Sequence, residues 1–132
     1  MVGEQNLATL LKSMSPGLIP GEYVFISFPD ARYGDHTDLE PIAAINESEG
    51  LTLVIPKSKA DGKGLDYESV FRGITLSVHS SLEAVGLTAA FSKKLTYHGI
   101  SANVIAGFYH DHIFVQSDYA EQAMAALGEL SS

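Results

Sequence analysis

The chain has 132 residues, a formal net charge of −8 and no cysteine. This length fits one domain or two very small subdomains that share a core. The lack of cysteine excludes disulfides, thiolate metal sites and a cysteine nucleophile. The excess of acidic side chains would repel a phosphate backbone, so we expect no direct nucleic-acid binding.

The first part of the chain predicts a short helix, a strand and a long loop. Apolar residues at positions 7, 10, 11 and 14 have helical spacing, and the prolines and glycines of residues 15–21 end that helix. Residues 22–28 are β-branched and aromatic, which is typical of a strand. Residues 29–41 are acidic and lack an apolar period, and loops of this length are often functional or mobile.

The next segments predict a hairpin followed by a polar connection. Two short apolar runs, residues 41–48 and 51–56, are separated by Glu49-Gly50. Residues 58–69 are polar and at most weakly helical. A strong strand then starts near residue 70, with Ile74, Leu76 and Val78 on one of its faces.

The C-terminal segment predicts a β-α-β-β-α unit. A helix beginning between Ser80 and Gly86 carries apolar residues at 87, 90, 91 and 95, and Gly99 ends it. Residues 101–108 and 113–117 form two strands around a polar tip, and residues 118–130 form the last helix. This order is ferredoxin-like with its final strand missing.

The missing strand must come from elsewhere. Only two residues follow the last helix, so the sheet has to be completed by the N-terminal half or by another subunit. We expect residues 51–56 to supply it. The chain would then form an N-terminal subdomain (1–68) and a C-terminal subdomain (69–132) that are interleaved, and the absence of a Gly/Ser-rich or Pro-rich linker agrees with this.

Three runs of the sequence carry a family likeness: FRGITLSVHSSLEAVGLTAAFSKKLTYHGISANVIAGFYHDHIFV, MSPGLIPGEYVF and EGLTLVIP. They resemble the ACT-domain family, the small amino-acid-sensing modules of metabolic enzymes and regulators. The likeness is strongest to tandem ACT-like proteins of uncharacterised role and covers nearly the whole chain. Ala84-Val85-Gly86-Leu87 stands where ACT domains usually carry Asp-x-Pro-Gly.

The resemblance implies an α+β protein with two ACT-like subdomains, each with an antiparallel sheet and helices on one face. It also implies a regulatory or sensing homodimer that binds a small molecule, most plausibly an amino acid, without catalysis or a cofactor. The N-terminus lacks the features of a signal peptide and no apolar run is long enough to span a membrane, so we expect a cytoplasmic protein. Two alternatives stay open: a metal-binding protein and a ligand-free dimerisation module.

The candidate ligand site joins the start of the third predicted helix to the hairpin that follows it. Free backbone N–H groups at a helix start favour a carboxylate, and Gly86 leaves room for close approach. An ammonium group would need an acceptor, which the tip of the hairpin could supply. The candidate residues are Val85, Gly86, Leu87, Asn103, Ile105, His110, Asp111 and His112.

Each of these residues also has a structural explanation. Gly86 would permit tight packing of the helix against a strand, and Asn103 would donate a structural hydrogen bond. His110-Asp111-His112 could be a polar turn, a ligand contact or a metal site. Two imidazoles lack the remaining ligands of a closed zinc site, so we expect no metal ion held jointly by His110 and His112.

Overall fold

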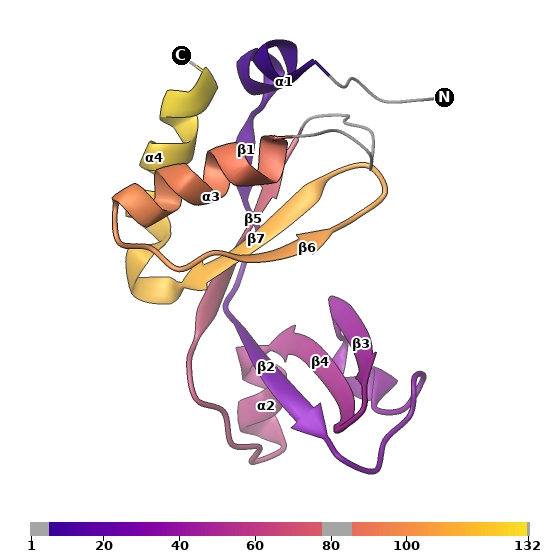
Figure 1. Ribbon diagram of the computed structural model, residues 1–132. Coiled ribbons are helices and arrows are strands. Elements are labelled where there is room, and N and C mark those ends of the chain that lie inside the picture. Colours follow the sequence, from indigo (N-terminus) through magenta and orange to yellow (C-terminus); the bar gives the residue numbers. More distant parts are fainter. Residues whose placement is uncertain (1–5, 78–85, 132) are drawn as a thin grey trace. The chain divides into compact units, whose positions relative to one another are not determined.

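The computed structural model describes residues 6–77 and 86–131 (Figure 1). The chain forms two compact units: Met1–Pro20 together with Arg72–Ser132, and Gly21–Phe71. We call them the first and second unit. None of the helices in the described part of the chain has the length and hydropathy that a membrane span requires.

The first unit is a sheet with helices on one face. Its strands lie in the order β1-β5-β7-β6, which is the order of a ferredoxin-like sheet. The strands are β1 (Pro16–Leu18), β5 (Phe71–Leu76, which begins one residue before this unit), β6 (Asn103–Ala106) and β7 (Asp111–Gln116). The helices are α1 (Leu7–Ser13), α3 (Leu87–Tyr97), α4 (Ala120–Gly128) and the short 3-10 turns η2 (Ser117–Tyr119) and η3 (Glu129–Ser131).

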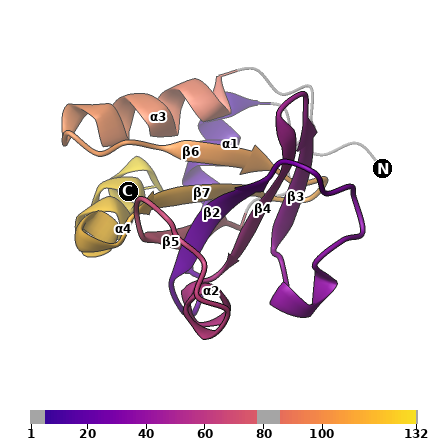
Figure 2. The same ribbon diagram turned by 90° about the horizontal axis from the view of Figure 1, so that it is seen from below.

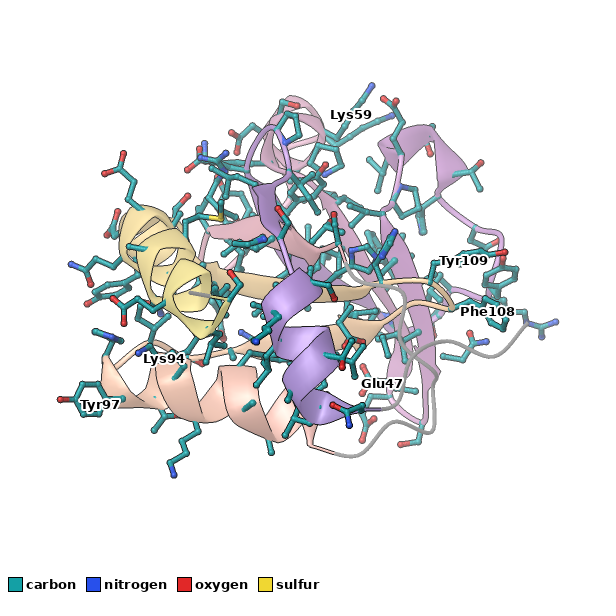
Figure 3. All side chains as sticks on the ribbon, turned by 90° about the horizontal axis from the view of Figure 1, so that it is seen from above. Glu47, Lys59, Lys94, Tyr97, Phe108 and Tyr109 are labelled. Carbon is teal, nitrogen blue, oxygen red and sulfur yellow. The ribbon has the colours of Figure 1, made fainter. Side chains whose placement is uncertain are left out.

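The core of the first unit confirms the predicted periodicities. Alternate residues of β5 and β7 point to the helices, and the helical residues at three- and four-residue spacing point back to them. The fully buried side chains from these elements include Leu10, Ile74, Phe91, Ile113 and Leu127. At the surface, Lys94 of α3, which is labelled in Figure 3, forms a 2.6 Å ion pair with Glu129 of η3.

The fourth strand of this sheet is β1, which lies in the segment that we expected only to end the first helix. Its residues pair antiparallel with β5, from Pro16 opposite Leu76 to Leu18 opposite Ile74. Pro16 is tolerated there because it is the first residue of a strand at the edge of the sheet. The prediction that residues 51–56 complete this sheet was wrong, since they pair with two strands of the second unit.

The second unit has the strand order β3-β4-β2, seen side by side in Figure 2. Its elements are β2 (Tyr23–Phe28), η1 (Thr37–Leu39), β3 (Ala43–Glu47), β4 (Gly50–Pro56) and α2 (Lys57–Gly62). The predicted hairpin is confirmed as β3–β4. Tyr23 pairs with Phe71, so the strand that follows α2 begins beside β2 and repeats the ferredoxin-like order.

Helix α2 corrects the expectation of a weakly helical segment. Ala60 is completely buried in the core of this unit. Lys57 and Asp61, four residues apart on the helix, form a 2.9 Å ion pair, and the Tyr67 hydroxyl donates to the same carboxylate. Helix α2 has little apolar period of its own. It is stabilised by the burial of Ala60 and by the polar contacts of Asp61 at the surface.

Candidate functional site

The start of α3 is built around Gly86. This residue is the N-cap of the helix and has a φ of 97°, a left-handed conformation that favours glycine. A Cβ atom there would lie 3.1 Å from Cδ2 of Leu7. Leu87, the first helical residue, is buried in the core of the first unit. Val85 lies outside the described residues. Backbone geometry and packing therefore explain Gly86 without a ligand.

The hairpin of β6 and β7 divides the other candidate residues between two faces. Ile105 lies opposite His112 and Asn103 lies opposite Phe114, and residues that face each other across strands point to the same side of a sheet. Asp111 therefore points to the other side, the one that the helices cover, together with Ile113. The structure does not gather all the candidates around one point.

On the face of the sheet that carries no helices, the side chains of His112 and Asn103 form hydrogen bonds within the protein. Nδ1 of His112 lies 3.0 Å from Oγ1 of Thr75, and the Asn103 side-chain amide donates to the Phe114 carbonyl at 3.1 Å. Partial burial lowers the pKa of His112, with a smaller contribution from the charge of His110. The structural role that we considered for Asn103 is thus present.

Asp111 is the half-buried carboxylate of the site. Burial raises the pKa of Asp111, although the two neighbouring histidines lower it. A carboxylate that has lost part of its hydration gains more from a nearby ammonium group than an exposed carboxylate does. Asp111 therefore has the electrostatic character of an ammonium acceptor.

The tip between the two strands is a tight turn. The Gly107 amide donates to the His110 carbonyl at 2.9 Å, which closes the turn. Phe108 and Tyr109 project outward from it with their ring centroids 5.0 Å apart (Figure 3). Within residues 6–77 and 86–131, no group of three or more His, Cys, Asp or Glu side chains is placed to hold a metal ion.

A concave site lies in the second unit and was not found from the sequence. The loop between β2 and β3, together with residues of β3 and β4, lines a partly open cavity of about 380 Å³. The cavity is lined by Tyr33, Gly34, Asp35, Thr37, Pro41, Ile42, Ala43, Ala44 and Leu53. A smaller hollow of about 260 Å³ shares Asp35 with it. The only sequence signal for this site was the unusual length of the acidic loop.

We expect the unfolding free energy to depend on His112 at mildly acidic pH. Because burial lowers the pKa of His112 in the folded state, the unfolded chain binds the proton more readily. The contribution of His112 to stability is present above its unfolded pKa and is lost as the pH falls through the lower, folded value. Urea unfolding of the wild type and His112→Gln between pH 7.5 and 5 should show the steeper loss in the wild type. Parallel pH profiles would contradict this.

Comparison with known proteins assigns nearly the whole chain to one family. A family model for the ACT domain matches residues 2–72, and a second ACT-domain model matches residues 68–129. No relative was found among curated proteins.

Solved structures agree with this assignment. A Vibrio cholerae protein of unknown function, described as a possible transport protein, is 57% identical over 96% of both chains, with a TM-score of 0.87. An aspartate kinase of Clostridium acetobutylicum is 12% identical, with a TM-score of 0.66, over 98% of this chain and 36% of the kinase. The regulatory subunit of aspartate kinase from Thermus thermophilus is 11% identical, with a TM-score of 0.63, over 87% of this chain and 95% of the subunit. The last two show a shared fold.

The fold and the matches lead to the same conclusion. Each unit has the ferredoxin-like strand order, and the two family models together span residues 2–129. ACT domains generally bind amino acids in regulatory modules. The chain belongs to the ACT-domain family and carries two ACT domains in tandem.

Proposed function

We propose that this chain is a regulatory module that binds an amino acid and has no catalytic activity of its own. The observation that carries the proposal is the pair of ACT domains, which together account for nearly the whole chain. A module of this kind passes its signal to a partner. We further propose that it works as a homodimer.

The proposed ligand site lies between the start of α3 and the tip of the β6–β7 hairpin. Helix α3 and strand β6 run in opposite directions, so the beginning of one and the end of the other lie toward the same end of the unit (Figure 1). The backbone N–H groups at the start of α3 suit the ligand carboxylate. Asp111, on the face that the helices cover, suits its ammonium group.

The candidate residues lie on two faces of the β6–β7 hairpin, and this reduces the number that can contact one ligand. Asn103, Ile105 and His112 point away from the side on which α3 lies. We therefore assign ligand contact to the backbone at Gly86 and to Asp111. His112 and Asn103 would support the hairpin through the bonds that they form to Thr75 and Phe114.

A thermal-shift screen of the twenty amino acids tests the proposal. A ligand at about 100 times its Kd adds about 2.7 kcal/mol to the unfolding free energy, which at this size raises Tm by roughly 3 to 6 °C. Light scattering at tens of micromolar protein, with and without the ligand, tests the dimer. No shift with any amino acid would contradict the proposed function. A response to divalent metals that disappears in His112→Ala would favour the metal-binding alternative instead.

A charge-neutral variant tests the site itself. Asp111→Asn should weaken binding of the amino acid more than binding of its deaminated analogue, because only the amino acid carries the ammonium group. Asp118→Asn, an exposed aspartate of η2, is the matched control and should bind like the wild type. A substitution at Gly86 is unsuitable, since its positive φ would strain any side chain whether or not a ligand binds there. Equal affinity in Asp111→Asn and the wild type would place the pocket elsewhere.

A further inference from the structure

Packing contacts fix the loop that lines the cavity of the second unit. Within this loop Leu39 is buried in the core, and the ring of His36 stacks on Phe28 with centroids 4.2 Å apart. His36 and Glu40 flank η1 and have φ values of 61° and 53°, a conformation that costs free energy for residues other than glycine. A loop held this way keeps a defined cavity of about 380 Å³, within the size range of small-molecule sites.

The acidic residues of this loop differ in their partners. Glu40 forms a 2.8 Å ion pair with Lys59 (labelled in Figure 3), and Asp38 forms a 3.3 Å ion pair with Lys63. Among the described residues, no cationic side chain forms an ion pair with Asp35, whose carboxylate accepts one hydrogen bond, from the Arg32 amide at 2.8 Å. Asp35 lines the cavity, whereas Asp38 and Glu40 do not.

The other lining residues indicate which further groups a positively charged ligand can carry. Pro41, Ile42, Ala43 and Ala44 give an apolar side, and Tyr33 contributes an aromatic ring that is 75% exposed. Such a ring can lie over a cation. The lining contains no lysine, arginine or histidine, so a ligand carboxylate would have no cationic partner there and would be repelled by Asp35.

We propose that this cavity binds a small organic ammonium ion that lacks a carboxylate. The ammonium group lies at Asp35, its alkyl part contacts Ile42 and the neighbouring alanines, and Tyr33 covers it. This site is separate from the proposed amino-acid site in the first unit and does not depend on it. A primary amine, the decarboxylated counterpart of an amino acid, has the required chemistry.

Three probes that share a four-carbon chain test the charge requirement. n-Butylamine carries the ammonium group alone, 1-butanol carries no charge, and norvaline adds a carboxylate to the carbon that bears the nitrogen. Backbone amide shifts of residues 33–44 are followed by NMR during titration of the full chain. We expect saturable shifts with n-butylamine that weaken as salt is raised, and weaker binding of the other two. Binding of norvaline as tight as that of the amine would refute the proposed ligand class.

Two variants locate the site. Asp35→Asn keeps an oxygen that can accept the Arg32 amide, so the turn is preserved while the charge is removed. For an exposed ion pair this should weaken n-butylamine binding by about fivefold. Asp38→Asn removes the same charge from the same loop outside the cavity and should bind like the wild type. Unchanged affinity in Asp35→Asn, or no saturable shift in the wild type, would overturn the proposal.

Discussion

Replacing Phe91 with alanine is expected to lower the free energy of unfolding by about 3–5 kcal/mol, because the surrounding side chains can fill the resulting cavity only in part. Phe91 lies on α3, is completely buried, and is among the largest buried side chains of the first unit. Urea unfolding followed by circular dichroism measures the change. The m value should stay near that of the wild type if the variant still folds to the same structure.

Tyr97→Ala on the same helix is the control for this variant. Its side chain is 84% exposed and projects from the end of α3 (Figure 3). Truncating an exposed side chain should change the unfolding free energy by no more than about 0.5 kcal/mol. Comparable losses in the two variants would mean that the core of the first unit is not where the structure places it.

Replacing Gly50 with alanine is expected to destabilise the second unit by about 3 kcal/mol or more. Gly50 has a φ of 140°, and a Cβ atom there would lie 2.5 Å from the Phe28 carbonyl oxygen and 2.7 Å from Cα of Pro29. Both atoms belong to the backbone, and Phe28 is tied to β4 through its pairing with Leu51. The clash cannot be relieved by a rotamer change. Hydrogen exchange should show lost protection in β2, β3 and β4.

Gly62→Ala gives the opposite expectation within the same unit. Gly62 ends α2, its φ is not positive, and a Cβ atom there would meet nothing within 4 Å. Alanine should therefore stabilise the fold by up to about 1 kcal/mol, because it restricts the unfolded chain without strain in the folded one. If Gly62→Ala lost as much stability as Gly50→Ala, the clash at Gly50 and the open space at Gly62 would not explain the effects of the two substitutions.

The sequence predicted those parts of the fold whose local pattern agrees with their final environment. Leu87, Phe91 and Leu95 have helical spacing and are all buried on one face of α3. Strand β1 was missed because Pro16 and Gly17 favour a turn locally, and only pairing with β5 makes them a strand. Helix α2 was missed for a similar reason, since its burial depends on Ala60 contacting a core formed by other segments.

The residue types of the candidate site could be chosen from the sequence, whereas their arrangement could not, and the site itself stays a prediction. Asp111 stood out as the acidic residue between two histidines, and burial does raise its pKa. Asp111 and His112 both lie in β7, and successive side chains of a strand alternate, so the two point to opposite faces. Neither the contact of Gly86 with Leu7 nor the cavity beside Asp35 follows from spacing, because both join segments that only the folded chain brings together.

The discontinuity of the first unit has a consequence for protein synthesis. Helix α1 and strand β1 are translated before the residues that bury Leu10 and Met14, which come from beyond position 72. Residues 21–71, by contrast, form a contiguous unit whose contacts are made within one stretch of the chain. The N-terminal segment instead lacks its core partners until α4 has been translated. The first unit can therefore complete its core only after residues more than a hundred positions apart, such as Leu10 and Leu127, have both been made.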